Sequence, residues 1–103
     1  MLEKSVEDYN LFENMSVDEA VQQMEKAWGF TAGKLALGVK ILEEMIKDGK
    51  CVKFLSFPAN LVASGIRGVF KEIIKRRLAD VVVTTCGTLD HDVARSWKKY
   101  FRG

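Results

Sequence analysis

Two short segments of the sequence combine small residues with hydroxyl, amide and carboxylate side chains. The first is Ser56–Gly65 (SFPANLVASG) and the second is Thr84–Asp92 (TTCGTLDHD), and each follows a short apolar run. In an open α/β sheet, ligands bind outside the carboxyl ends of the parallel strands, where backbone amides at helix N-termini face a phosphate or another polar group. Neither segment contains GxGxxG or GxxxxGK(S/T). The residues alone therefore leave a ligand site and ordinary turn chemistry equally open.

Asp90, His91 and Asp92 form the densest group of ionisable side chains in the chain. Such a group can bind a cation, and an imidazole can carry a proton near neutral pH. Acidic residues are also favoured in the first turn of a helix, by about 0.3–1 kcal/mol, because of the helix dipole. The residues alone favour this helix-turn interpretation. A metal site is not indicated, because His91 is the single histidine and adjacent residues of a helix project in different directions.

The two cysteines, Cys51 and Cys86, have no CxxC spacing, which argues against a disulfide framework or a zinc ribbon. Cys86 lies five residues before His91, so a nucleophilic pair is one interpretation. A small cysteine in the turn after a strand is the commoner case, and we favour it. No catalytic residue is therefore assigned within this chain.

The segment Arg95–Arg102 (RSWKKYFR) interleaves cations with aromatic residues. Single-stranded nucleic acids bind such patterns by stacking bases on the rings. A helix that buries Trp97, Tyr100 and Phe101 and exposes its lysines has the same pattern, and we favour that interpretation. Large aromatic residues at this position also indicate a surface that something else covers.

The spacing of apolar residues predicts a helical layer in the first half of the chain. Residues 1–15 are polar and irregular, and we expect an arm that lies on another part of the protein. Ser16 and Glu19 have capping-box spacing, which predicts a helix that starts at Val17 and ends at Gly29. Thr31 is expected to cap a second helix. Its predicted apolar stripe consists of Leu35, Val39, Leu42 and Ile46.

The second half of the chain alternates between strand and helix patterns. We expect strands over 51–56 and 81–83 and helices over 60–77 and 89–101, with the valine run 81–83 covered on both faces of the sheet. The expected buried side of the first of these helices consists of Ile66, Val69, Phe70, Ile73 and Ile74. The predicted fold is therefore α/β: a Rossmann-like parallel sheet portion (βαβα) that spans part of residues 16–103 and follows the helical layer.

The composition is that of one folded domain. The chain has 103 residues, a formal charge of +2 and 48% hydrophobic residues, so disorder and a dedicated nucleic-acid binder are both disfavoured. No apolar run approaches the roughly 20 residues of a membrane-spanning helix, and the N-terminus lacks the apolar core of a secretory signal. We expect a cytoplasmic protein with no membrane and no nucleic-acid partner.

Three blocks of the sequence resemble deoxyhypusine synthase, especially its archaeal members. They are Phe54–Gly68 (FLSFPANLVASGIRG), Asp80–Arg95 (DVVVTTCGTLDHDVAR) and Gly29–Ala36 (GFTAGKLA). The resemblance covers the chain from about Ser16 onward. It implies an enzyme that binds NAD in a Rossmann-like fold, dehydrogenates spermidine and passes its aminobutyl group to a lysine of the hypusine-containing translation initiation factor. It also implies a tetramer with sites shared between subunits.

The resemblance implies roles for residues of both segments. The turn Ala59–Ala63 would bind NAD, with Asn60 as its main polar contact. The implied cofactor residues are Ala59, Asn60, Leu61, Val62, Ala63, Thr85, Cys86, Gly87 and His91. Asp90 and His91 would hold the polyamine substrate. This chain has alanine at 59 and 63, where eukaryotic members have serine, and histidine at 91, where the family has an acid.

The family's nucleophilic lysine follows a tryptophan–glycine pair far downstream, and Trp97-Lys98 is not that motif. Family chains are roughly three times longer. We therefore expect an N-terminal portion, whether a split-gene subunit, a processed fragment or a truncated chain, that is inactive until a partner supplies the lysine. Two alternatives stay open: a non-catalytic regulatory or scaffold subunit, and a homospermidine synthase-like transferase with a diamine acceptor.

Overall fold

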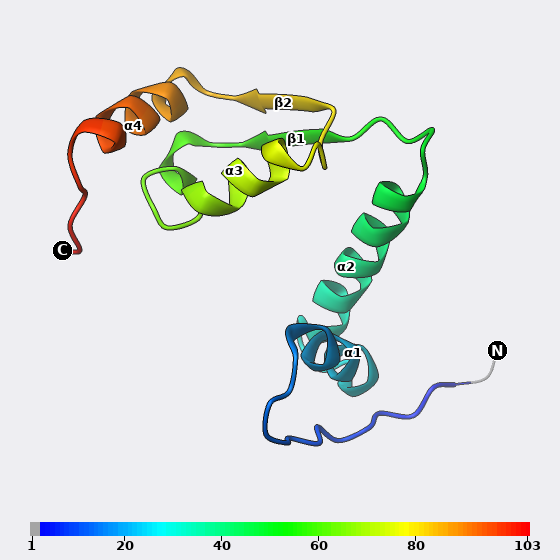
Figure 1. Cartoon of the computed structure of the whole chain (residues 1–103). Coiled ribbons are helices and arrows are strands. Elements are labelled where there is room, and N and C mark those ends of the chain that lie inside the picture. The colour runs from blue at the N-terminus through cyan, green and yellow to red at the C-terminus, as the bar shows by residue number, and fades with distance from the viewer. Residues whose placement is uncertain (1–2) are drawn as a thin grey trace. The chain divides into compact units, whose positions relative to one another are not determined.

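The computed structural model describes residues 3–103, which form two compact units that divide between Gly49 and Lys50. The first unit contains two helices, α1 (Val17–Ala27) and α2 (Ala32–Lys47). The second contains two strands and two helices in the order β1, α3, β2, α4, with a short 3-10 helix after β1 (Figure 1). In the part of the chain described, no helix has the length and apolar character needed to cross a membrane.

The first helix begins at the predicted capping box. The amide of Glu19 donates to Ser16 Oγ over 3.2 Å, and the amide of Ser16 donates to Glu19 Oε2 over 2.7 Å. These bonds satisfy two amides that the helix itself leaves without acceptors. Because Ser16 donates to the Glu19 carboxylate from its backbone and its hydroxyl, the pKa of Glu19 lies below its ordinary value.

The first helix ends at Ala27, two residues earlier than predicted, and a tryptophan takes the role expected of a glycine. Trp28, not Gly29, adopts the left-handed conformation, with φ of 57°, and its amide donates to Met24 O over 3.0 Å. Its indole then lies against Gly33, where a Cβ would stand 2.4 Å from the ring. Gly33 and Ala36 are the buried residues of α2. Small residues are therefore required where α2 meets this turn.

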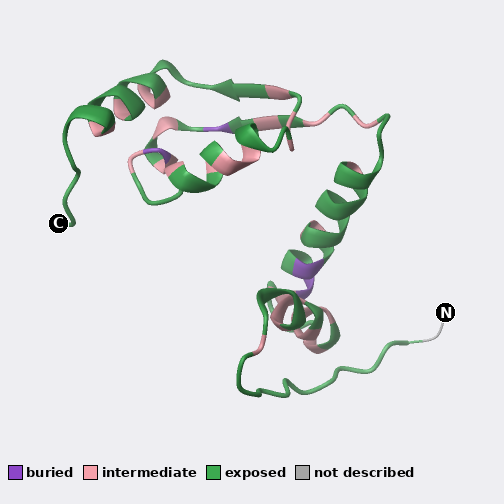
Figure 2. Cartoon of the chain, viewed as in Figure 1, coloured by how far each residue is buried: buried purple, intermediate pink, exposed green. Residues whose placement is uncertain are grey.

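Two expectations for α2 are not met. Thr31 precedes the helix but its side chain forms no capping hydrogen bond, because its backbone is helical rather than extended. The predicted stripe lies on α2, yet its members are 41–57% exposed; they are Leu35, Val39, Leu42 and Ile46. Figure 2 shows α2 exposed along most of its length.

The N-terminal arm lies along α1. Gln23 accepts from the amide of Asn10 over 2.7 Å and donates from Nε2 to Asn10 O over 2.7 Å. The amide of Glu7 donates to Lys26 O over 3.2 Å, and the two side chains form an ion pair at 3.5 Å. Residues 1 and 2, which the predicted arm includes, lie outside the described part of the chain.

The second unit is built on two parallel strands. β1 (Phe54–Phe57) pairs with β2 (Val81–Thr84), with Phe54 opposite Val81 and Phe57 opposite Thr84. The helix α3 (Arg67–Lys75) is the crossover between them. The α/β class and a parallel β-α-β portion are therefore confirmed, whereas these residues do not form a complete Rossmann-like sheet. The first strand was predicted over 51–56 and lies three residues later at its start, ending before Pro58.

The amino ends of the two strands are fixed by Asp80. Its carboxylate accepts from the amide of Lys53 over 2.7 Å and lies 3.1 Å from the Lys53 ammonium. The amides of Asp80 and Val81 both donate to Lys53 O. These donors hold the pKa of Asp80 below its ordinary value, with the backbone amide of Lys53 as the largest cause.

The prediction of one helix over 60–77 is wrong for residues 60–66. Ala59–Leu61 form a 3-10 helix, η1, and α3 begins only at Arg67. Between them, Ser64 Oγ donates to Leu61 O over 2.7 Å and accepts from the amide of Ile66 over 3.3 Å. A serine that bonds to its own turn in this way competes with helix formation. A loop therefore remains between the sheet and α3.

The core of the second unit is small. Phe57 and Val62 are 8% and 3% exposed, and the ring of Phe57 stacks on Phe70 of α3 at 3.8 Å. Of the residues expected on the buried side of α3, Phe70 and Ile73 are half-buried. The others are 42–56% exposed; they are Ile66, Val69 and Ile74.

The burial of β2 and the bounds of α4 differ from the predictions. Val82 and Val83 are 39% and 52% exposed, so the strand is not covered on both faces. The helix α4 (Cys86–Trp97) begins three residues before the predicted start and ends four residues early. Trp97 and Phe101 are 85% and 89% exposed. The expectation that this helix buries its aromatic residues is therefore wrong within this chain.

Substitution of Ser16 by alanine tests the capping box. We expect Ser16→Ala to lower the free energy of unfolding of the first unit by about 1 kcal/mol, because α1 loses the acceptor of a first-turn amide. Thr31→Ala is the matched control, since Thr31 precedes α2 without a side-chain cap. Thermal unfolding followed by circular dichroism measures both. Equal losses in the two variants would contradict the assigned cap.

The pair formed by Asp80 and Lys53 predicts a pH dependence. Folding lowers the pKa of Asp80, so its stabilisation is present above the carboxyl pKa of the unfolded chain and is lost as the pH falls through the lowered folded-state pKa. We expect Asp80→Asn to have a lower Tm than the unaltered chain near neutral pH, with the difference disappearing in acid. Asp8→Asn is the control. A Tm difference that persists unchanged in acid would contradict the pairing.

Candidate functional site

The two segments singled out in the sequence meet at the carboxyl edge of the sheet. Because β1 and β2 are parallel, the residues after Phe57 and after Thr84 emerge at the same edge. There η1 packs against α4. A Cβ on Gly87 would stand 2.9 Å from the Cβ of Ala59, closer than atoms of this kind approach. Gly87 therefore permits the close contact between the two segments.

Two threonine hydroxyls close the strand ends. Thr84 Oγ1 donates to Phe57 O over 2.7 Å and lies 2.6 Å from Thr88 Oγ1. Because a hydroxyl has a single proton, Thr88 donates to Thr84 in this pair. The bond to Phe57 joins the last residues of β1 and β2, and the bond to Thr88 joins β2 to the first turn of α4.

Two arginines connect α4 to the residues before α3 and at its start. Arg95 Nη1 donates to Val62 O over 2.7 Å and to Ser64 O over 2.5 Å. Arg67 Nε donates to Asp92 Oδ1 over 2.7 Å. Sequence reasoning did not single out either arginine as a site residue. The spacing of three residues places Arg95 on the same side of α4 as Asp92, but it does not indicate the carbonyl partners of Arg95.

Backbone amides at this edge remain without acceptors in the described part of the chain. The side chain of Thr85, which precedes α4, forms no capping hydrogen bond. No acceptor within residues 3–103 is found for the amides of Cys86 and Gly87, or for those of Ala63 and Gly65. Such donors suit a phosphate-bearing or otherwise anionic group. The edge therefore has the donor set that the sequence suggested.

Within the ionisable cluster Asp90–Asp92, Asp92 and His91 have different partners. Asp92 binds Arg67, and His91 Nδ1 lies 2.9 Å from the hydroxyl of Tyr100, whose ring meets the imidazole edge to face. Since α4 begins at Cys86, the first turn contains no acidic residue. The interpretation of Asp90 and Asp92 as first-turn acids is therefore wrong. Asp92 instead connects two helices.

Two hollows flank α4. One, of about 590 Å³, is lined by Asp90, Trp97 and other residues of α4 and by Lys98 and Tyr100 after the helix. The other, of about 1020 Å³, extends from Val62 along α3 and includes Thr84, Thr88 and Arg95. Among the implied site residues, Asp90 lines the first hollow and Val62 lines the second. Ala59–Leu61 follow β1, and Thr85, Cys86 and Gly87 follow β2 at the start of α4, whereas His91 lies further along α4 at Tyr100.

Cys86 and His91 are not placed to react together. Cys86 is exposed and lies five positions before His91 on the helix, which places the two side chains on different sides of α4. Both cysteines are free thiols. Across residues 3–103, no three His, Cys, Asp or Glu side chains are grouped as metal ligands.

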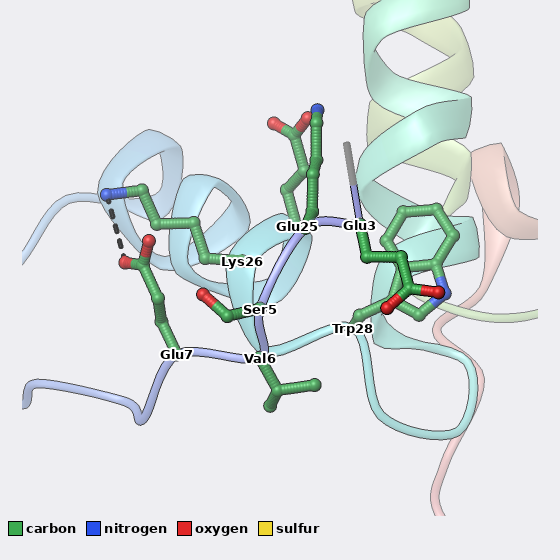
Figure 3. Close-up of a pocket in the computed structure, with 8 residues that line it drawn as sticks. Glu3, Ser5, Val6, Glu7, Glu25, Lys26 and Trp28 are labelled. Carbon is green, nitrogen blue, oxygen red and sulfur yellow. Dashed lines mark ion pairs between the residues drawn. The ribbon is translucent and has the colours of Figure 1, made fainter. Parts of the chain in front are cut away.

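A separate hollow lies under the N-terminal arm in the first unit. It measures about 760 Å³, and Figure 3 shows Glu7 and Lys26 paired on one side of it and Trp28 on the other. Its charged side chains are mostly exposed, Glu7 pairs with Lys26, and Glu25 pairs with Lys40 outside the hollow. We assign it no ligand.

Comparison with known proteins identifies relatives along the whole chain. The family model described as deoxyhypusine synthase matches residues 19–103. A protein named probable deoxyhypusine synthase from Picrophilus torridus is 40% identical over 103 residues, covering 100% of this chain and 33% of the relative. One of the same name from Sulfurisphaera tokodaii is 43% identical over 104 residues, covering 100% and 33%. Another from Ignicoccus hospitalis is 44% identical over 103 residues, covering 99% and 32%.

The chain therefore spans about a third of the length of the curated relatives it matches, which agrees with the predicted N-terminal portion. The matched region includes both segments that meet at the carboxyl edge of the sheet. This chain belongs to the deoxyhypusine synthase family, a family of transferases.

Proposed function

We propose that this chain is the N-terminal part of an NAD-dependent deoxyhypusine synthase. The whole enzyme transfers the aminobutyl group of spermidine to a lysine of the hypusine-containing translation initiation factor, in the cytoplasm. The observation that carries the proposal is the meeting of Ala59 and Gly87 at the carboxyl edge of two parallel strands, in a chain that belongs to this family. The proposed function therefore rests on the geometry of the strand edge as well as on the family.

The residues at this edge fit a dinucleotide. The amides of Ala63, Cys86 and Gly87 face no acceptor in the described chain, and Asn60 is exposed beside them. We propose that these groups bind NAD together with Ala59, Leu61, Val62, Thr85 and His91. When bound, NAD supplies the hydride acceptor for spermidine and later returns the hydride. The chain's own contribution is to bind and orient the cofactor through backbone donors.

The polyamine requires carboxylates. Asp90 is exposed and lines the hollow of about 590 Å³ beside α4, which leaves its carboxylate accessible to an ammonium group. His91 is half-buried with Nδ1 at the Tyr100 hydroxyl, so Nε2 is the ring atom left for a ligand. We propose that Asp90 binds the cationic substrate and that His91 orients it.

We propose that the family's nucleophilic lysine lies on the remaining part of the enzyme or on a partner chain. The curated relatives are about three times as long as this chain, and the family's nucleophilic lysine belongs to the part that this chain does not match. The exposed Val82 and Val83 give an apolar surface for further chain to cover. We propose assembly with that remaining part into a tetramer-like oligomer, and no transferase activity for this chain alone.

Co-expression tests the proposed function. We expect this chain and the remaining two thirds of the Picrophilus torridus relative to co-purify, to bind NAD and to produce NADH when spermidine is added. Native mass and NADH absorbance measure these outcomes. Asn60→Ala is expected to weaken NAD binding, and Asp90→Ala to raise the KM for spermidine, each by about ten-fold, the factor for one lost polar contact of about 1.4 kcal/mol.

The same experiment separates the alternatives. A chain that stays alone and binds no NAD contradicts the proposal. Full activity in an assembly that carries Asn60→Ala or Asp90→Ala indicates a scaffold role instead. Transfer to a diamine but not to the translation factor indicates a homospermidine synthase-like enzyme.

Gly87→Ala tests the contact between the two segments. The new methyl group would meet Ala59 at 2.9 Å, so η1 and α4 must separate, at a cost of about 1–3 kcal/mol in unfolding free energy. We expect the co-expressed assembly to lose most of its NAD affinity. Gly68→Ala is the matched control, because a Cβ there meets nothing within 4 Å. Equal NAD affinity in the two variants would contradict the assigned contact.

A further inference from the structure

Arg95 occupies an unusual position between α4 and the loop that precedes α3. Its Nη1 donates to two carbonyl oxygens of that loop, those of Val62 and Ser64, at 2.7 and 2.5 Å. On its other side, the guanidinium lies 5.6 Å from the centre of the Tyr100 ring. Arg95 is half-buried, and Val62 is 3% exposed. The arginine is therefore packed in place and bonded to backbone rather than to a carboxylate.

These bonds determine which way two peptide groups point. In a trans peptide, the carbonyl of one residue and the amide of the next point in opposite directions, and the chain contains no cis peptide among residues 3–103. Because the carbonyl oxygens of Val62 and Ser64 face Arg95, the amides of Ala63 and Gly65 must point away from it. Neither amide has an acceptor in the described chain. Arg95 thus holds two free donors so that they point away from its own guanidinium.

The other hydrogen bonds of the loop are uncharged. The amides of Val62 and Ser64 donate to Ala59 O and Leu61 O at 3.0 and 3.2 Å, within the usual range. Ser64 Oγ donates to Leu61 O over 2.7 Å, and Ser64 O also accepts from the amide of Arg67 over 3.4 Å. Ile66, which precedes α3, provides no side-chain cap. A charged donor shared by two carbonyls is stronger than these neutral bonds. Arg95 is therefore the strongest of these restraints on the peptide orientations of the loop.

We propose that Arg95 is a positioning residue for ligand binding. It fixes the loop 62–65 so that the amides of Ala63 and Gly65 can donate hydrogen bonds to the anionic part of the ligand. It acts through the loop and does not touch the ligand. This inference rests on the proposed function, because the ligand is taken to be NAD. Its structural part, the control of the loop by Arg95, does not depend on the cofactor.

Two measurements on Arg95→Ala and Arg95→Lys test the inference. The first is hydrogen exchange of the Val62 and Ser64 amides in the 103-residue chain. The second is NAD affinity of the assembly formed with the remaining two thirds of the Picrophilus torridus relative. We expect Arg95→Ala to raise the exchange rates and to weaken NAD binding by about ten-fold each, the effect of losing charge-assisted bonds at a half-buried site. Arg95→Lys should lie between, since one ammonium replaces the planar guanidinium.

Arg67→Ala is the matched control. It removes a charged bond of similar length to α4 but leaves the carbonyls of Val62 and Ser64 with Arg95. We expect it to lower stability without selectively increasing exchange in the loop. Exchange in β1 and β2 shows whether each variant remains folded.

The outcomes distinguish failure of the inference from failure of the proposed function. If the unaltered assembly binds NAD and Arg95→Ala binds it equally well, the positioning role is wrong while the function stands. Unchanged loop exchange in a folded Arg95→Ala chain also overturns the role. If the unaltered assembly binds no NAD, the proposed function is wrong, and so is the role of Arg95 in NAD binding. Hydrogen exchange in the loop 62–65 still decides whether Arg95 controls the loop.

Discussion

The parallel pairing of β1 and β2 is the constraint on which the site depends. Pairing in one direction brings the residues after Phe57 and the residues after Thr84 to the same edge, although 26 positions of sequence separate the two strand ends. The pairing is held at both ends by side chains, with Asp80 bonded to Lys53 at one and Thr84 bonded to Phe57 at the other. An antiparallel arrangement would place the two loops at opposite edges, and no shared site would exist.

The sequence predicted the features that depend on local rules. The capping box at Ser16, the end of β1 before Pro58 and the parallel β-α-β order follow from residue type and spacing, and the structure has all three. The turn at 62–66 was missed because apolar spacing continues through it, while the Ser64 hydroxyl bonds within the turn. Arg95 was missed because its partners are carbonyls 33 and 31 positions away, which no local pattern reveals.

The incorrect burial predictions have a single physical cause. Apolar residues in the expected stripe of α2, in β2 and near the end of α4 are spaced as if they faced a core, but most are substantially exposed. An isolated pair of parallel strands buries too little apolar surface to account for such spacing. The spacing of apolar residues reflects the core of the protein in which the sequence evolved. This chain spans about a third of the length of its relatives.

Alanine at position 59 is consistent with the contact at the carboxyl edge of the sheet, although eukaryotic members of the family have serine there. A Cβ on Gly87 would stand 2.9 Å from the Cβ of Ala59, so this contact leaves no room for a side chain at 87. Packing therefore favours glycine at 87 opposite Ala59. The free donors at this edge are backbone amides, which alanine retains as well as serine does. The departures at 59 and 63 therefore remove hydroxyl contacts without removing the donors that the turn geometry provides.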